Sequence, residues 1–154
     1  VYTEAVEDNF LLVEQGIRLY DIGTISVFDA FTQLRFTVGV AGNANFTNPE
    51  TMPDDHALAP QTDTMHWNII DGYIFNKIAL QTAATSDTTV YEIGTTPVDI
   101  TLDYSVELVG GFDTELALDV DYLQFFTGID FINDTPEAIK SQIMANTNTV
   151  FSVH

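Results

Sequence analysis

The side chains best suited to chemistry lie between residues 54 and 67, where two of the three histidines occur among carboxylates. Residues 54–56 read Asp-Asp-His, and Asp63 precedes His66 by three positions. A neutral imidazole is a good ligand for copper or zinc, and carboxylates complete such a site where thiolates are absent. The chain contains no cysteine, which excludes disulfides and thiolate metal sites. We therefore interpret His56 and His66 as candidate metal ligands; the alternative for His66 is a half-buried imidazole bonded to loop backbone.

Trp67 is the single tryptophan of the chain and directly follows His66. A lone tryptophan usually anchors a core between sheets, because its large ring buries much apolar surface. Beside candidate metal ligands it has a second interpretation, as an aromatic side chain that is modified or takes part in redox chemistry. Both interpretations stay open at this point.

The pattern of apolar residues indicates mainly β-strands. Residues 98–108 alternate strictly between apolar and polar side chains, and residues 116–122 repeat the pattern after Gly110-Gly111. Two such runs around a Gly-Gly turn predict an antiparallel hairpin. The outer face of this hairpin would carry four carboxylates, which makes calcium a further candidate metal. They are Asp99, Asp103, Asp119 and Asp121.

Other strands are expected in shorter runs, separated by a turn at Gln15-Gly16 and by a long irregular segment. The expected strands are 10–13, 17–20, 34–40 and 73–80. Residues 41–64 contain three prolines and many Asn and Asp residues without periodicity. This segment is therefore predicted as a loop, and loops of such length inside a domain are usually functional or disordered.

The only convincing helix lies near the C-terminal end of the chain. Asp134 or Thr135 can cap it, and Pro136 suits its first position. It is expected to end near Asn146, with a last strand at 150–153. Together these patterns predict one domain, residues 1–154, with an all-β fold: an antiparallel β-sandwich of immunoglobulin-like or jelly-roll type with one short C-terminal helix.

The composition narrows the possible function classes. Four basic residues stand against 23 acidic ones, which gives a formal net charge of −19. Nucleic acids and anionic membrane surfaces require a basic footprint, so neither is an expected partner. No apolar run approaches the about 20 residues needed to span a bilayer. The Thr- and Asp-rich, Lys-poor composition suggests an extracytoplasmic location. The motifs of common enzyme classes are absent, so no enzymatic activity is expected.

Several short motifs follow one another in a specific order. They are LRFTVGV at 34–40, Met-His-Trp at 65–67, Gly-Tyr-Ile-Phe at 72–75, Ile-Gly at 93–94, and Asn146 followed by Phe151. This order resembles the MbnP-like family of exported bacterial proteins, which are relatives of the copper-associated surface proteins MopE and CorA. The resemblance covers about residues 10–153.

The resemblance implies a β-sandwich in the periplasm or on the cell surface. In some family members, two histidines and an oxidised tryptophan (kynurenine) hold a copper ion, and a partner di-haem enzyme of the cytochrome c peroxidase type makes the kynurenine. Trp67 matches that tryptophan, whereas Glu92 replaces one family histidine. Residues 45–49, Asn-Phe-Thr-Asn-Pro, are a degraded form of the family's N-H-x-D-P element. We therefore expect copper or zinc to be bound by His66, Glu92 and His56, with Trp67 as the candidate modified residue.

Family members usually carry further strands before the region that matches residue 10. We therefore expect a divergent member: either the chain is a fragment, or something else supplies the missing strands. Strands donated by a neighbouring subunit would give a homo-oligomer joined through strand edges. Two functions stay open. The first is an exported, periplasmic or cell-surface, metal-binding protein. The second is a structural, self-assembling surface protein that uses the same sandwich without metal.

Overall fold

The computed structural model describes residues 10–24 and 29–153 of the chain. In this part the chain forms four two-stranded antiparallel ladders and a single α-helix. This confirms the predicted all-β, antiparallel class with one short C-terminal helix. The strands are β1 (Ala30–Val38), β2 (His66–Asn68), β3 (Gly72–Tyr73), β4 (Asn76–Leu80), β5 (Thr89–Ile93), β6 (Val98–Glu107), β7 (Leu118–Val120) and β8 (Phe151–Val153). The helices are α1 (Pro136–Asn146) and the 3-10 helices η1 (Gly42–Phe46), η2 (Pro49–Thr51), η3 (Tyr122–Phe126) and η4 (Thr147–Thr149).

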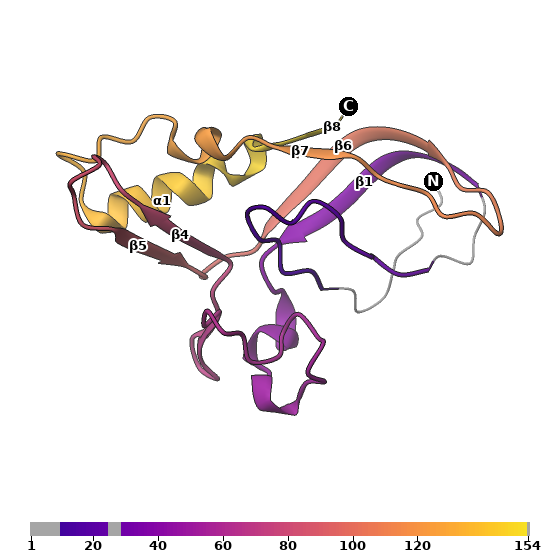
Figure 1. Ribbon diagram of the computed structural model, residues 1–154, viewed down its shortest axis with the longest axis horizontal. Coiled ribbons are helices and arrows are strands. Elements are labelled where there is room, and N and C mark those ends of the chain that lie inside the picture. Colours follow the sequence, from indigo (N-terminus) through magenta and orange to yellow (C-terminus); the bar gives the residue numbers. More distant parts are fainter. Residues whose placement is uncertain (1–9, 25–28, 154) are drawn as a thin grey trace.

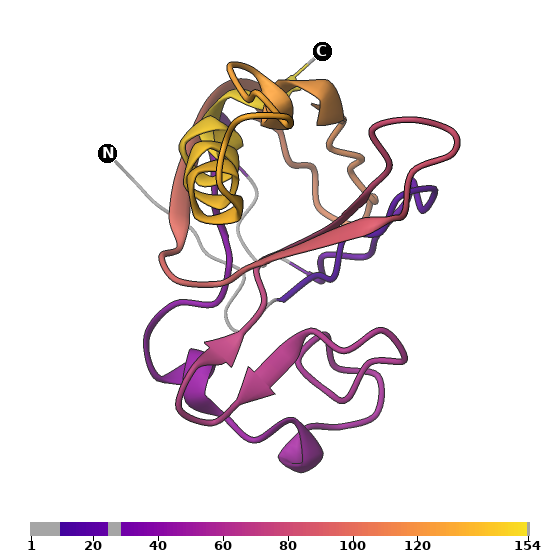
Figure 2. The ribbon, with the colours of Figure 1, turned by 90° about the vertical axis from the view of Figure 1, so that its left-hand side faces the viewer.

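Three of the four described ladders, all but β1–β6, contribute residues to two hydrophobic clusters. Figure 1 shows α1 lying along the β4–β5 ladder, with the long β1–β6 ladder beside them. The segment that runs from η1 to β3 forms a lobe below both, and Figure 2 shows the same lobe from the side. Phe36 of β1 contacts Phe151 of β8 edge to face, with ring centroids 5.0 Å apart, which joins the β7–β8 ladder to β1–β6.

The strand at Val98–Glu107 forms as predicted, but the predicted hairpin is wrong. β6 pairs with β1 in a ladder that runs from Val38–Val98 to Ala30–Glu107, and β7 pairs with β8. The alternation of apolar residues specifies which face of a strand is buried and says nothing about its partner. In addition, ten residues separate Glu107 from Leu118, far more than the two-residue loop of a tight hairpin.

The outer face on which four carboxylates would meet is therefore not formed. Asp99 and Asp103 lie on β6, where Asp99 accepts a hydrogen bond from Thr37 Oγ1 at 2.7 Å. Asp119 lies on β7, in a different ladder. Asp121 caps η3 by accepting a hydrogen bond from the Leu123 N–H at 3.0 Å. This separation removes the arrangement on which the calcium prediction was based.

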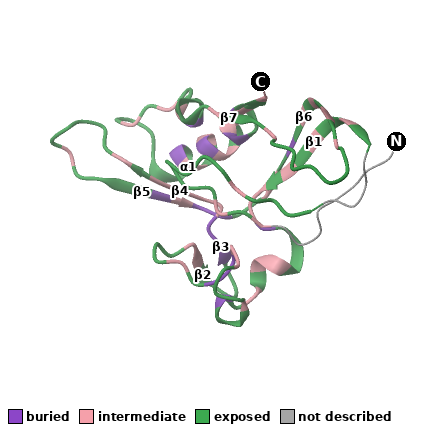
Figure 3. Ribbon diagram, turned by 45° about the vertical axis from the view of Figure 1, so that its right-hand side comes forward, coloured by how far each residue is buried: buried purple, intermediate pink, exposed green. Residues whose placement is uncertain are grey.

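The larger core lies between α1 and the β4–β5 ladder. Ile143, on the inner face of α1, has no exposed surface, and Tyr91 and Ile93 of β5 pack in the same cluster. Figure 3 shows buried segments in both α1 and β5. Thr135 caps the helix by accepting a hydrogen bond from the Ala138 N–H, with Pro136 at the first position. The predicted start and end of this helix are confirmed.

The second hydrophobic cluster lies in the lobe, which includes the segment 41–64 that the sequence predicts as a loop. Residues 41–64 contain only 3-10 helices and turns, as expected for a loop, but they bury Leu58 against Val40 and Tyr73. The Tyr73 hydroxyl donates a hydrogen bond to the Leu58 carbonyl at 2.8 Å. This segment is therefore part of the folded structure.

The short strands predicted at 10–13 and 17–20 are wrong, because the structure gives these residues no strand. The turn predicted between them is confirmed, and Gly16 adopts a φ of +100° there. Without paired backbone on either side, a few alternating residues do not make a strand. Among the described residues, no helix is long and apolar enough to cross a membrane.

Candidate functional site

Trp67 lies on β2, where its indole ring packs directly onto the backbone of Gly94. A Cβ atom added at Gly94 would lie 2.7 Å from Cζ3 of Trp67 and would also meet the carbonyl oxygen of Tyr73. Only glycine fits at this position without a shift of the ring. The Ile-Gly motif at 93–94 is therefore the platform on which Trp67 is positioned.

A second glycine joins the lobe to the same strand pair. Gly72 has a φ of +81°, a conformation that favours glycine, and the side chain of Asn45 lies against its Cα. Oδ1 of Asn45 also accepts a hydrogen bond from the Tyr73 N–H at 2.9 Å. Residues of the 45–49 motif are thus held beside β2 and β3.

The Trp67 indole N–H donates a hydrogen bond to Glu92. The distance from Nε1 to Oε2 of Glu92 is 2.9 Å, and the other carboxylate oxygen lies 3.5 Å from Nζ of Lys77. Lys77 in turn donates to Asp63 Oδ1 at 2.7 Å and to the Thr64 carbonyl at 3.0 Å. Each oxygen of Glu92 therefore has a partner, the indole on one side and a cation on the other.

Electrostatics keep Lys77 positively charged in this network. The hydrogen bond to Asp63, with further attraction from Asp63 and Glu92, raises the pKa of Lys77 above its ordinary value. A protonated ammonium group beside Glu92 repels any metal ion that approaches the same carboxylate.

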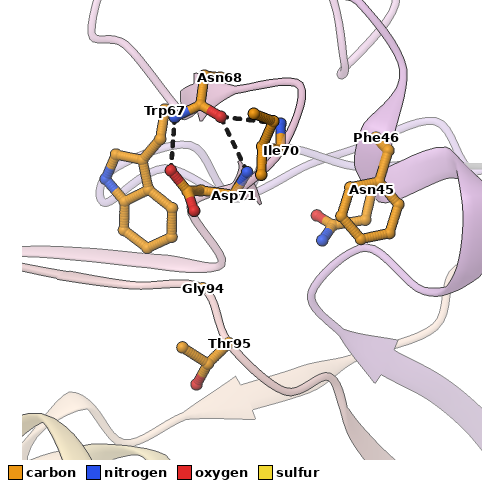
Figure 4. Close-up of a pocket in the computed structure, with 8 residues that line it drawn as sticks. All are labelled: Asn45, Phe46, Trp67, Asn68, Ile70, Asp71, Gly94 and Thr95. Atoms are coloured by element: carbon orange, nitrogen blue, oxygen red, sulfur yellow. Dashed lines mark hydrogen bonds between the residues drawn. The ribbon is translucent and has the colours of Figure 1, made fainter.

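An open depression of about 740 Å³ lies next to Trp67. Its lining residues are Asn45, Phe46, Trp67, Asn68, Ile70, Asp71, Gly94 and Thr95. Figure 4 shows Trp67, Asn68 and Asp71 on one side, and Asn45 and Phe46 on the other. The residue that follows Asn45 in the degraded N-H-x-D-P element therefore faces the same space as Trp67.

His66 lines a different hollow from its neighbour Trp67. Its ring packs against Tyr73, with ring centroids 4.6 Å apart, and it lines a smaller pocket of about 300 Å³ together with Met65 and Gln61. Successive side chains of a strand point to opposite faces, which separates His66 from the Trp67–Glu92 pair. Its Nε2 atom is buried and has no hydrogen-bond partner within the described part of the chain.

His56 has a local structural role. Its Nδ1 accepts a hydrogen bond from the Leu58 N–H at 3.1 Å, and its ring lies 5.7 Å from that of Phe10. This contact closes a turn of the lobe loop. The structure thus brings Trp67 and Glu92 together and leaves His66 and His56 at other places.

The donor groups present do not match the metal site that the resemblance implies. Across residues 10–24 and 29–153, no three His, Asp or Glu side chains converge as metal ligands do. Of the positions that match the family site, residues 46 and 67 line opposite sides of one depression, and residue 92 bonds to Trp67. These positions carry Phe, Trp and Glu, which supply one engaged carboxylate and no imidazole.

Two parts of this site were missed by sequence reasoning. Lys77 matches no ligand motif, and only the β4–β5 pairing places it beside Glu92. Asp63, a candidate carboxylate near His66 in the sequence, bonds to Lys77 instead. The Asn68–Asp71 turn was missed as well, although the spacing Asn-Ile-Ile-Asp before a glycine is a turn signal.

Comparison with known proteins gives one family match. The model of the MbnP family matches residues 4–145. No match is found among curated proteins or among solved structures.

Proposed function

Because the chain belongs to the MbnP family, as the match over residues 4–145 shows, we propose that it is an extracytoplasmic, non-enzymatic binding module that works without a metal ion. Its binding surface is the open depression beside Trp67. The other described hollow, at His66, contains a single imidazole and one carboxylate, that of Glu50.

One observation carries this proposal. Glu92, which occupies the place of a family histidine, accepts the Trp67 indole N–H and lies beside the Lys77 ammonium. Glu92 keeps further lone pairs, but the ammonium group beside it repels a metal cation and so weakens this carboxylate as a ligand. The second matching position, Phe46, has no donor atom at all. The site therefore keeps the family's tryptophan in a setting that favours other ligands.

Elemental analysis of the purified chain tests the proposal. After exposure to excess copper or zinc and desalting, the chain should retain far less than one metal ion per molecule. One tightly held ion per chain that is released in Glu92→Ala or His66→Ala would overturn the proposal. The mass of the Trp67 peptide from the same sample should equal that of unmodified tryptophan.

A gain-of-function variant makes the test sharper. If the depression keeps the geometry of the family site, Phe46→His combined with Glu92→His should restore retention of copper. Each single variant should retain less than the double variant. A matched control, Phe112→His, places an imidazole at an exposed phenylalanine elsewhere. Equal retention in the control and in the double variant would contradict the proposed role of residues 46 and 92.

A further inference from the structure

The depression beside Trp67 presents aromatic faces to solvent. Trp67 is 37% exposed and Phe46 51% exposed, and they approach the depression from opposite sides. Ile70, at 79% exposed, lies between them along the rim. A tryptophan that is partly held by Gly94 and partly open offers a fixed π-face to a ligand.

Most polar groups of the lining are already used within the chain. Oδ1 of Asn68 accepts the N–H groups of Ile70 and Asp71 at 2.8 and 2.9 Å, and its Nδ2 donates to Asp71 Oδ2 at 2.6 Å. Oδ1 of Asn45 accepts the Tyr73 N–H. A neutral polar ligand such as a sugar needs several free, directional donors and acceptors. The lining offers few of these.

What the lining does offer is negative charge without a counter-ion. Asp71 is a lining carboxylate, and no lysine or arginine lines the depression. The two ion pairs of the described residues both involve Lys77, with Glu92 and Asp63 as partners, and neither includes Asp71. The whole chain carries a net charge of −19, which raises the local concentration of cations.

We propose that this depression binds an alkylammonium group, which stacks on Trp67 while Asp71 supplies the counter-charge. The proposal rests on the proposed function and names the ligand class of the same surface. A cation over the face of a tryptophan is attracted by the ring quadrupole, and a nearby carboxylate adds Coulomb attraction. The ligand class is set by chemistry that is present in the lining: an exposed aromatic face and a carboxylate, with no basic residue beside them.

Titration of the full chain with choline tests the proposal. We expect saturable shifts in the NMR amide signals of residues 67–71 and 94–95, and in the Trp67 indole N–H. The neutral isostere of choline, with carbon in place of the quaternary nitrogen, should bind about fivefold or more weakly. Equal shifts from the two compounds would overturn the proposal, because apolar contact alone would then explain binding.

Two variants test whether the charge of Asp71, and not the net charge of the chain, determines choline affinity. Asp71→Asn keeps an oxygen to accept the Asn68 amide and removes the charge, so choline affinity should fall about three- to tenfold. Asp87→Asn removes one charge from the β4–β5 loop and should leave the affinity within about twofold. A sugar that shifts the same signals while choline does not would overturn the cation proposal and leave the binding module in place. Stoichiometric metal retention would instead overturn the binding module itself.

Discussion

Trp67 is held by two residues of one segment, Glu92 and Gly94, and Lys77 supports it indirectly through Glu92. The Gly94 backbone supports its ring, Glu92 accepts its N–H, and Lys77 holds Glu92 from the other side. The motif comparison predicted that residues 67 and 92 belong together, and their hydrogen bond agrees with that association. It could not predict the Lys77 contact, because charge pairing between neighbouring strands depends on their register. Register is a property of the assembled ladder.

Substituting Gly94 with alanine should displace the Trp67 ring. The new methyl group would overlap Cζ3 of Trp67 and the Tyr73 carbonyl oxygen, so we expect a loss of about 1–3 kcal/mol in the free energy of unfolding. Because Trp67 is the only tryptophan, its fluorescence maximum should shift in the folded variant. Urea denaturation followed by fluorescence measures both effects.

Gly111→Ala is a suitable control for this substitution. Gly111 has a φ of +82°, but no atom lies within 4 Å of an added Cβ. This variant should lose stability through backbone strain alone and keep the native fluorescence of Trp67. An unshifted Trp67 spectrum in Gly94→Ala would show that the ring does not rest on Gly94.

The elements that were predicted well, α1 and β6, are those whose own residues carry the sequence pattern. The helix α1 follows from a cap, a proline and an apolar stripe, all within the helix sequence itself. The β6 strand follows from its own alternation. Its partner does not, because β1 lies about 70 residues earlier and the long loop after Glu107 turns away from β6. The sequence therefore predicts strands better than their pairing.

Asn146 joins α1 to η3, which is a contact between elements. Its Nδ2 donates to the carbonyl oxygens of Phe125 and Thr127, both at 2.9 Å, while its Oδ1 accepts from Gln142. Asn146→Ala leaves these carbonyls without their donor, so the free energy of unfolding should fall by about 1–3 kcal/mol. Asn148→Ala, at an exposed position two residues later, should change it by less than about 0.5 kcal/mol. Equal losses in the two variants would contradict the joining role of Asn146.

The turn before α1 should make stability depend on acid pH. The Asn133 side chain, with backbone N–H groups of residues 132 and 133, donates hydrogen bonds to Asp130 and lowers the pKa of its carboxyl group. A carboxyl group with a lowered folded-state pKa stabilises the fold above its unfolded pKa of about 3.9, and this contribution is lost as the pH falls through the folded value.

Thermal unfolding of the Asp130→Asn variant tests this pH dependence. The variant should have a lower Tm than the native chain at pH 7, and the difference should shrink toward zero as the pH falls through the lowered folded-state pKa of Asp130. Asp87→Asn is the control, because it also removes one negative charge but at another place on the surface. A Tm difference that stays constant from pH 7 to pH 2 would assign the effect to something other than the Asp130 charge.

At the scale of the whole molecule, the exposed strand edges and apolar side chains favour self-association, and the net charge opposes it. Every strand of the described part has one unpaired edge, since each ladder contains only two strands. Several large apolar side chains are exposed as well, among them Phe112, Leu123 and Ile132. Both features favour association. The net charge of −19 opposes it by repulsion between copies.

Salt should therefore control assembly of this chain. Raising sodium chloride from about 0.01 M to about 1 M shortens the Debye length from about 30 Å to about 3 Å, which removes the repulsion and leaves the strand edges free to pair. By light scattering at pH 7, we expect a monomer at the low concentration and dimers or larger species at the high one. Hydrogen exchange should slow at amides of the ladders and stay unchanged on the exposed face of α1. A monomer at both concentrations would count against a self-assembling structural role and would leave the depression beside Trp67 as the basis of function.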